Sequence, residues 1–280
     1  MSALRSIARA LLPRGVRNAL RAPGKSARRA LHEALYRAGR HPVLEVRPGW
    51  RMRCHPAAYP VIAQHQLRDP EQAAELDRFI AGCAPGMVLF DVGAHYGVFT
   101  IAALHYGGPA ARAVALDPSP AAVRVARAQA RLNGGAQRVR VVQAAAGDGA
   151  GMVRLVAVGV QAEGFYVPAD AAGGGLEVPQ VTLDALAAET GLAPTHVKID
   201  VEGGEAAVLR GARGLLSSPH PPVLFLELHN QMIREQGGDP AEAPALLAAL
   251  GYRVEGEDGA VLEGAALATP AMLRVVARKP

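Results

Sequence analysis

The stretch MVLFDVGAHYG at residues 87–97 decides the fold of this chain. A short apolar run predicts a buried strand over 87–90, and after two glycines an apolar pattern predicts a helix over 98–104. Glycines at such a turn let the backbone approach a ligand closely, and the first turn of the helix offers free N–H groups. Gly93 and Gly97 have the spacing G-x-x-x-G, with His95 where a dinucleotide fingerprint has its second glycine. A ligand without a diphosphate therefore fits this loop better than a dinucleotide.

An acid closes the next predicted strand, which covers residues 113–116. Asp117 follows that strand, 26 residues after Asp91, and precedes Pro118. A carboxylate at this point of a nucleotide-binding sheet is placed to accept hydrogen bonds from ribose hydroxyls. A nucleoside ligand without a diphosphate points to S-adenosylmethionine. The alternative is that Asp91 and Asp117 only cap helices.

Outward from this core, apolar runs alternate with helical patterns, which predicts βαβ units and a mostly parallel sheet of the α/β class. Ser119 and Pro120 are typical of a helix start, and Asp239-Pro240 with Glu242 predicts another. One helix is expected over 205–216. Near the end of the chain, two strand-like runs without a long helix between them predict an antiparallel pair at the sheet edge. The further strands are expected at 139–142, 197–199, 223–226, 252–255 and 273–277.

We expect three regions along the chain: a basic arm at 1–40, a hairpin and helix at 41–84, and a catalytic domain at 85–280. The hairpin pairs 43–47 with 51–54 around Pro48-Gly49, and Asp69-Pro70 begins a helix that ends near Ile80. Within the third region, the glycine-rich stretch 152–181 reads as an insertion or a strand hairpin.

The composition excludes several classes of protein. Half of the 280 residues are hydrophobic and 20% are charged, which is enough apolar material for a packed core. Two cysteines, Cys54 and Cys83, are too few for a disulfide framework or a zinc site and are typical of a reducing compartment. Residues 1–40 hold ten of the 30 basic residues and one acid, whereas the remainder holds 20 basic and 24 acidic residues. The acidic body gives no reason to expect nucleic-acid binding.

The basic arm allows two interpretations, a solvated leader or an interfacial helix that contacts an anionic membrane surface. Residues 92–111 carry no charged side chain, but glycines, histidines and Pro109 within them argue against a membrane span. We therefore expect a cytoplasmic protein, with attachment to the inner face of the membrane as the alternative. The sequence does not determine the oligomeric state.

A second set of motifs lies in the latter half of the chain. VTLD at 181–184 is followed by HVKIDVEGGE at 196–205, VLRGA at 208–212 and VLFLELH at 223–229. With the DVGA loop at 91–94, these segments resemble the FkbM family of S-adenosylmethionine-dependent methyltransferases in type and order. Two residues depart from the family pattern: Asp117 stands where the family usually has Glu, and His95 where it usually has Asn.

The resemblance implies a Rossmann-like class I methyltransferase with a seven-stranded sheet and an antiparallel C-terminal strand. It implies S-adenosylmethionine as cofactor and a hydroxyl of a sugar, glycan or secondary metabolite as acceptor. The loop would hold the methionine end, Asp117 the ribose, and the turn at 144–148 would lie beside the adenine. The implied cofactor-binding residues are Asp91, Gly93, Ala94, His95, Gly97, Asp117, Pro118, Ala145 and Ala146.

Four side chains at the ends of the fourth and fifth strands are the candidate catalytic residues: Asp200, Glu202, Glu227 and His229. Each pair is two residues apart, so in extended chain both members project the same way. Asp200 and Glu202 could place a base beside the methyl group or hold a divalent ion on oxygen ligands, or one of them could cap the following helix. His229 is a candidate general base because its ordinary pKa lies near 6.5, with a binding or structural role as the alternative. No metal ligands are assigned from the sequence, and whether the reaction needs a divalent ion stays open.

Two other functions remain open at this level. A nicotinamide-dependent oxidoreductase could use a similar sheet, although His95 stands where a glycine should be. A non-catalytic member that binds cofactor or a partner would keep the glycines but tolerate loss of the acids after the fourth and fifth strands, and those acids are present.

Overall fold

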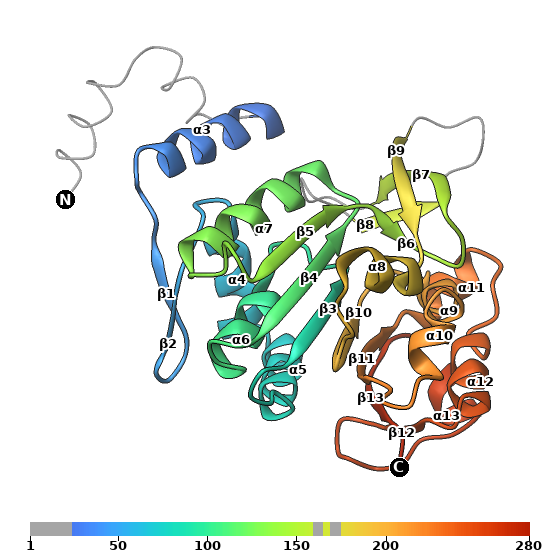
Figure 1. The fold of residues 1–280 in the computed structure, drawn as a ribbon. Helices are drawn as coiled ribbons and strands as arrows, with labels where there is room; N and C mark the ends of the chain where they lie inside the picture. Colours follow the sequence, from blue (N-terminus) through green and yellow to red (C-terminus); the bar gives the residue numbers. More distant parts are fainter. Residues whose placement is uncertain (1–23, 159–164, 169–174) are drawn as a thin grey trace. The chain divides into compact units, whose positions relative to one another are not determined.

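A computed structural model describes residues 24–158, 165–168 and 175–280. The chain divides into two compact units, residues 1–69 and 70–280, and each is described by itself. The second unit is built on a seven-stranded sheet with the order β12-β13-β11-β10-β3-β4-β5 (Figure 1). Five consecutive strands, β11-β10-β3-β4-β5, are mutually parallel, and β13 runs antiparallel both to β11 and to the edge strand β12. The strands are β3 (Val88–Val92), β4 (Arg112–Asp117), β5 (Val139–Gln143), β10 (His196–Ile199), β11 (Val223–Leu228), β12 (Arg253–Glu255) and β13 (Leu273–Arg278).

This sheet confirms the predicted α/β class and the predicted antiparallel pair. The central strands are buried on both faces, which is why they read as continuous apolar runs without alternation. Each predicted strand is present, and its bounds differ from the expectation by no more than two residues at either end.

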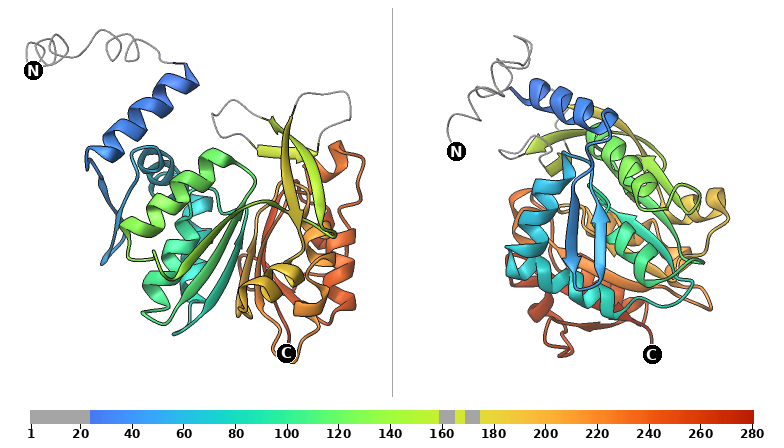
Figure 2. Two further views of the ribbon diagram at one scale, coloured as in Figure 1. Left: turned by 45° about the horizontal axis from the view of Figure 1, so that its top comes forward. Right: turned by 90° about the vertical axis from the view of Figure 1, so that its left-hand side faces the viewer.

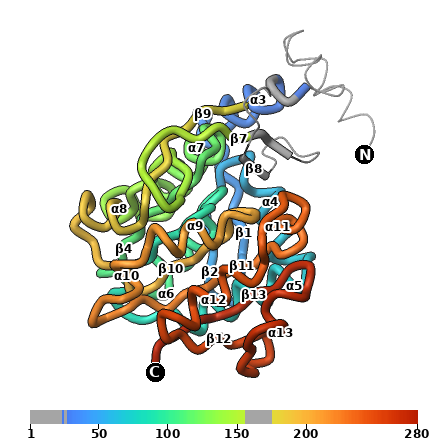
Figure 3. Tube along the Cα trace, turned by 90° about the vertical axis from the view of Figure 1, so that its right-hand side faces the viewer, coloured from blue at the N-terminus to red at the C-terminus, as the bar shows by residue number. Residues whose placement is uncertain are grey.

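Helices cover both faces of the sheet (Figure 2). On one face lie α5 (Pro70–Ala81), α6 (Val98–Tyr106) and α7 (Pro120–Leu132). There the ring of Phe79 meets those of Phe99 and Phe225 edge-on at 5.2 and 5.1 Å. The other face packs against α8 (Leu183–Thr190), α9 (Glu205–Arg210), α10 (Arg213–Leu216) and α12 (Glu242–Ala249), seen over the sheet in Figure 3.

The expected helix boundaries are confirmed in most places. Ser119 caps α7 by accepting a hydrogen bond from the Ala122 amide, with Pro120 at the first helical position. The expectation of one helix over 205–216 was wrong, because the chain breaks between α9 and α10 at Gly211. A Cβ at that glycine would lie 1.9 Å from the carbonyl oxygen of Gly147, so the break follows from a close approach of two backbones. Three helices of the second unit were not predicted: α8, α11 (Asn230–Glu235) and α13 (Ala265–Ala268).

The glycine-rich stretch forms a second, four-stranded sheet with the order β6-β9-β7-β8. Its strands are β6 (Ala145–Ala146), β7 (Gly151–Val158), β8 (Phe165–Pro168) and β9 (Leu176–Val181). The expected hairpin corresponds to β7 and β8, which pair antiparallel, whereas β9 was not predicted. Residues 159–164 and 169–174 of this stretch lie outside the described part of the chain.

The first unit contains α3 (Lys25–Arg37), the hairpin of β1 (Val43–Arg47) and β2 (Trp50–Arg53), and α4 (Ala58–Leu67). The hairpin confirms the prediction, and α4 was not expected. Tyr36 of α3 packs its ring against those of His41 and His55, with centroids 5.0 and 4.8 Å away. Residues 1–23, where most of the basic arm falls, lie outside the described residues. Among the described helices, none is long and apolar enough to cross a membrane.

Candidate active site

The predicted site residues gather at the carboxyl edge of the parallel sheet. The loop 93–97 follows β3, Asp117 ends β4, and Asp200 follows β10, which is the strand beside β3. Glu227 lies in β11, with His229 just after it. Parallel strands in register bring their carboxyl ends to one edge, so residues more than 100 positions apart in the sequence become neighbours.

The loop after β3 depends on positive backbone angles. Gly93 has φ +82°, and a Cβ there would lie 1.8 Å from the carbonyl oxygen of Asp200. Gly97 has φ +75° and His95 has φ +46°. Histidine tolerates this left-handed region better than most side chains, so the exchange of the family's usual Asn for His keeps the loop geometry. The loop after β3 is thus in direct backbone contact with the strand end that carries Asp200.

The amides of this loop are tied to β4. The N–H groups of Gly93 and Ala94 both donate to the carbonyl oxygen of Leu116 at 2.9 Å. The amide of His95 donates to Asp117 Oδ2 at 2.8 Å, and that of Ser119 donates to Oδ1 at the same distance. These bonds fix the loop beside the second strand before any ligand binds.

Asp117 is 7% exposed, and burial raises its pKa to about 6. Each of its oxygens accepts one backbone hydrogen bond, and a carboxylate oxygen has room for a second. The capacity that remains suits hydroxyl donors, as a ribose would supply.

Asp91 fits the helix-capping alternative that the sequence left open. Its Oδ2 accepts hydrogen bonds from the Thr100 amide at 3.0 Å and the Thr100 hydroxyl at 2.6 Å, in the first turn of α6. Burial raises the pKa of Asp91, which is 1% exposed. No hydrogen bond within the described chain takes up the amides of Val98 and Phe99, so the first turn of α6 keeps donors for an anionic group.

These features fit an adenosyl ligand. The two amides at the start of α6 are hydrogen-bond donors and suit the amino-acid carboxylate of such a ligand. The carboxylate at the end of β4 is an acceptor and suits the hydroxyl groups of its ribose. The positive φ angles leave a backbone surface without a Cβ at Gly93 and Gly97. Three of the other expected residues have clear places: Pro118 precedes the cap of α7, and Ala145 and Ala146 pair with β9.

The acids after β10 and β11 belong to a buried charge network, which we define as Glu75, Lys198, Asp200, Glu202, Glu205, Glu227, His229 and Arg274. Lys198, 2% exposed, places Nζ 3.1 Å from Glu75 and 3.3 Å from Asp200 Oδ2. Its ammonium also lies 4.5 Å from the centroid of the Phe99 ring. Desolvation alone would lower the pKa of Lys198, but the surrounding carboxylates raise it above its ordinary value, so the side chain remains charged.

Arg274 closes the network from the antiparallel strand. It stands opposite Glu227 in the register of β13 and β11, and its Nη2 donates to Glu227 Oε1 at 2.7 Å. Its Nε lies 3.4 Å from Glu75 Oε2. The guanidinium therefore joins a helix and a strand that are far apart in the sequence.

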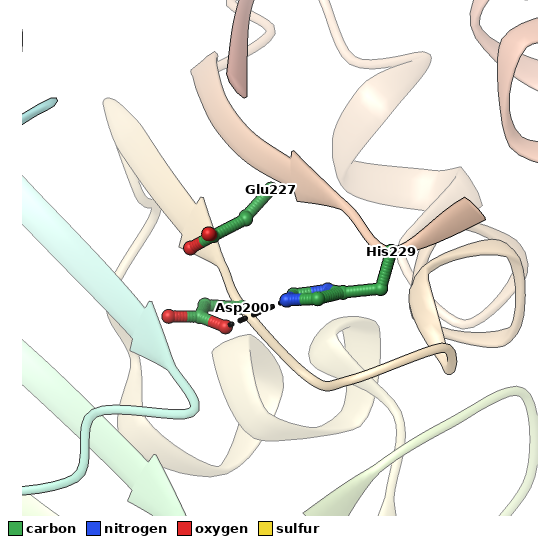
Figure 4. A group of neighbouring side chains, drawn as sticks. All are labelled: Asp200, Glu227 and His229. Carbon is green, nitrogen blue, oxygen red and sulfur yellow. Dashed lines mark ion pairs between the residues drawn. The ribbon is translucent and has the colours of Figure 1, made fainter. Parts of the chain in front are cut away.

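His229 is held by the carboxylate of Glu205, which shares a 2.7 Å hydrogen bond with its Nδ1. The other ring nitrogen, Nε2, faces two more carboxylates: Glu202 Oε2 at 3.3 Å and Asp200 Oδ1 at 3.8 Å. Figure 4 shows the rings and carboxylates of Asp200, Glu227 and His229 pointing toward one another. One ligand atom from each of the three lies within 4.8 Å of the other two.

Neither Asp200 nor Glu202 caps the next helix, which was one alternative for them. The cap position of α9 is Gly204, which makes no side-chain cap bond, and Glu205 instead accepts from the Gly203 amide at 3.0 Å. Glu202 adopts φ +56°, an uncommon angle for a residue with a long side chain. Its carboxylate is thereby turned toward His229.

The crowding of carboxyl groups shifts their proton affinities. Burial would raise the pKa of Asp200, but Lys198 and His229 hold it below its ordinary value. Burial raises the pKa of Glu202 to about 7 and that of Glu227 to about 8, the latter also because of Asp200. Burial would lower the pKa of His229, yet the carboxylates around it raise it to about 9. Glu205 occupies Nδ1, so Nε2 is the ring nitrogen that faces the site, and the role of His229 as general base stays a prediction.

Sequence reasoning missed the network residues that are distant in the chain. Glu75 lies on the buried face of α5 with Leu76 and Phe79, and Arg274 lies within the buried part of β13. A charge at a buried position of an otherwise apolar pattern was the available signal for both. Lys198 was noticed only as a supporting residue.

Comparison with known proteins gives one family match. The family model described as "Methyltransferase FkbM domain" matches residues 91–254, which include every expected catalytic and cofactor-binding residue. No curated protein matches the chain.

Among solved structures, an O-methyltransferase from Bacillus cereus in complex with SAH is 16% identical, with 80% of this chain and 88% of that chain covered and a TM-score of 0.45. A precorrin-6y C5,15-methyltransferase from Geobacter metallireducens is 17% identical, with coverage of 74% and 86% and a TM-score of 0.40. A putative rRNA-methylase from Clostridium thermocellum is 8% identical, with coverage of 74% and 96% and a TM-score of 0.44.

Proposed function

Since this chain belongs to the FkbM family of methyltransferases and uses S-adenosylmethionine as its cofactor, we propose that it methylates a hydroxyl group of a sugar, glycan or secondary metabolite. The observation that carries the proposal is the contact between the two halves of the site. The loop after β3 touches the backbone of Asp200, so a cofactor on that loop would lie next to the acids that follow β10 and β11.

The cofactor would be held by the chain's own groups described above. The amides at the start of α6 are placed for the methionyl carboxylate, the carboxylate of Asp117 for the ribose hydroxyls, and the turn that contains Ala145 and Ala146 for the adenine. When bound, the cofactor supplies an activated methyl group on a sulfonium, which needs no further activation by the protein.

The protein must therefore hold the acceptor oxygen in line with the methyl group and take up the hydroxyl proton. Orientation of this kind can contribute on the order of 7–11 kcal/mol, and a placed base about 10²–10⁴-fold. Asp200 and Glu227 are each paired with a permanent cation: Lys198 helps to hold the pKa of Asp200 below its ordinary value, and Arg274 occupies Oε1 of Glu227 with a 2.7 Å hydrogen bond. Glu202 has no such partner among the described residues and is turned into the site by its backbone. We assign the proton transfer to Glu202, with Asp200 and Glu227 as groups that orient the acceptor.

The test is transfer from isotopically labelled cofactor to a panel of hydroxyl compounds, each paired with an analogue whose hydroxyl is already methylated or replaced by an amine. Product mass should rise by one labelled methyl group only for the free hydroxyl member of a pair. Transfer to amines or carbon centres alone would refute the assignment of oxygen as the acceptor atom.

Variants test the roles of the acids separately. Asp200→Ala and Glu227→Ala should lose turnover while calorimetric affinity for S-adenosylhomocysteine changes little, since neither side chain belongs to the cofactor set. Wild-type turnover in both variants would contradict the placement of the acceptor at this cluster.

The basic residues at 1–40 give a second, independent proposal about location. We propose that this arm makes weak contact with anionic membranes, and the proposal rests only on the charge of the arm. Co-sedimentation with anionic vesicles should fall when residues 1–22 are deleted, and unchanged sedimentation would exclude it.

A further inference from the structure

The three side chains drawn in Figure 4 have the arrangement of a metal-binding site. Asp200, Glu227 and His229 come from the ends of two adjacent parallel strands, and one ligand atom of each lies within 4.8 Å of the others. Ligands around a divalent ion stand about 2.0–2.3 Å from it, so their atoms lie up to about 4.6 Å apart. Small side-chain movements would therefore suffice for all three to reach one ion.

Each of the three side chains is oriented by a partner that takes only one of its ligand atoms. Lys198 contacts Asp200 through Oδ2, and Arg274 contacts Glu227 through Oε1. Glu205 takes Nδ1 of His229. Asp200 Oδ1, Glu227 Oε2 and His229 Nε2 take no part in these three contacts. In metal sites, the ligating side chains are regularly oriented by hydrogen-bond partners that do not contact the metal themselves. The commonest such partner is a carboxylate bound to the nitrogen of a ligating histidine that does not contact the metal.

The burial and orientation of the His229 ring are a second observation. The residue is 8% exposed, and its Nε2 makes no hydrogen bond within the described part of the chain; it only faces carboxylate oxygens at 3.3 and 3.8 Å. A buried ring nitrogen aimed at converging carboxylate oxygens, with the opposite nitrogen bound to a buried carboxylate, is set up to bind a cation through its lone pair. Glu205 is itself fully buried, and its second oxygen has no hydrogen-bond partner.

Charge balance points the same way. The network holds five carboxyl groups, Glu75, Asp200, Glu202, Glu205 and Glu227, against two permanent cations and the ring of His229, so the carboxyl groups outnumber the basic groups. Buried charges are normally paired or coordinate metals. A divalent cation between Asp200 and Glu227 would relieve the repulsion between two carboxylates that the fold holds together.

We propose that Asp200, Glu227 and His229 bind one divalent first-row transition ion, of the class of Mn²⁺, in an open site that leaves coordination positions for the acceptor. Two carboxylates and one imidazole fall between the all-oxygen sites of Mg²⁺ and the nitrogen- and sulfur-rich sites of Zn²⁺, which indicates this class. The proposal rests on the proposed function for its use: the ion would bind the acceptor hydroxyl oxygen and acidify it, and the hydroxyl proton would pass to Glu202. The sequence left open a divalent ion held by Asp200 and Glu202, and the proposal keeps Asp200 and places Glu227 and His229 beside it.

The primary test is binding of Mn²⁺ alone to the full chain after exhaustive chelation. Free Mn²⁺ gives a six-line electron paramagnetic resonance signal that broadens on binding, so a titration should show one site per chain. Pulsed measurements on the bound ion should show coupling to one imidazole nitrogen, which tests His229 in the unaltered protein.

Variants locate the ion. Asp200→Asn and His229→Gln should weaken Mn²⁺ binding by at least tenfold, and Glu205→Gln by about 10–100-fold, because Glu205 orients the ring of His229. Glu263→Gln, which changes an exposed carboxylate outside the network, should leave the affinity unchanged. Affinity for S-adenosylhomocysteine, measured in parallel, shows that each variant is folded.

The outcomes separate this proposal from the proposed function. Absence of Mn²⁺ binding at millimolar concentration, no coupling to nitrogen, or equal affinity in the Asp200→Asn and Glu263→Gln variants would overturn the metal site. Hydroxyl methylation that persists at full rate in chelated enzyme would likewise overturn it, and leave the proposed function in place. Specific Mn²⁺ binding without methylation of any hydroxyl would support the site and count against the proposed function instead.

Discussion

Protonation of Asp117 should control cofactor affinity between pH 7 and pH 5. Burial raises the pKa of this carboxyl to about 6 in the protein without cofactor, with the amides of His95 and Ser119 working against the shift and the charges of Asp91 and Asp200 adding to it. Ribose hydroxyls donate to the ionised form, so only that form binds well. About nine-tenths of the carboxyl groups are ionised at pH 7 and about one-tenth at pH 5, which predicts roughly tenfold weaker binding, or about 1.4 kcal/mol.

The same pKa shift makes the stability of the folded protein depend on pH. The pKa is raised from 3.8 in the unfolded chain to about 6 in the folded one, so the folded protein binds more protons between these values. The free energy of unfolding therefore falls as pH rises through this range, by roughly 3 kcal/mol from this group if it stays unliganded. Bound cofactor offsets that loss, so thermal stabilisation by S-adenosylhomocysteine should be larger at pH 7 than at pH 5.

The assay is calorimetric titration with S-adenosylhomocysteine at pH 5, 6 and 7. Asp117→Asn should bind about 10–100-fold more weakly than wild type at pH 7, because charge-assisted hydrogen bonds are lost, and its affinity should not change with pH. Asp258→Asn is a matched control, since Asp258 is exposed and accepts one local amide, that of Ala260. A flat profile in wild type, or the same tenfold change in Asp117→Asn, would refute the reasoning.

Three further substitutions test the site. Gly93→Ala should lower the free energy of unfolding by at least about 1–2 kcal/mol and weaken cofactor binding, because the new Cβ would lie 1.8 Å from a carbonyl oxygen. Gly86→Ala is the control, since Gly86 has a similar φ but its Cβ would meet only one atom, at 3.8 Å. In urea denaturation the control should therefore show the cost of the backbone angle alone. Lys198→Met should lower the free energy of unfolding by about 3–5 kcal/mol, because it leaves buried carboxylates unpaired. Arg154→Met breaks an exposed ion pair and should lower it by less than about 1 kcal/mol. Equal losses in the two variants would contradict the buried network. Glu202→Gln should reduce kcat by about 10²–10⁴-fold with cofactor affinity intact, and a rate within threefold of wild type would exclude it as the base.

Much of the fold could be predicted from the sequence because strand and helix signals agree with the final packing. The apolar run before Asp91 and the cap formed by Ser119 and Pro120 are local signals, and local hydrogen bonds and burial satisfy both. The break between α9 and α10 at Gly211 could not be predicted, because it depends on the carbonyl oxygen of Gly147. That residue follows β6 of the four-stranded sheet and is distant in the sequence. Helix α4 carries Pro60 and has little amphipathic pattern, so its sequence gives a weak signal.

The candidate site divides in the same way. Asp200 and Glu227 could be found because each follows or closes a strong strand signal within a recognisable motif. The pairing of Glu227 with Arg274 could not, because it depends on which strand lies beside β11. The tilt of the His229 ring is set by Glu205, and only coordinates reveal which ring nitrogen is left for the site.

The strand order at the antiparallel edge constrains when the site can be completed. Strand β13 is the last strand in the chain, yet it lies between β11 and β12 rather than outside them. The partner of Glu227 is thus the last charged side chain of the network to leave the ribosome, and until it does the gap in the sheet stays open. In nascent chains that are halted before residue 273, Glu227 should therefore lack its cationic partner and the edge of β11 should lack its neighbouring strand. Synthesis of β13 completes both the sheet and the candidate site.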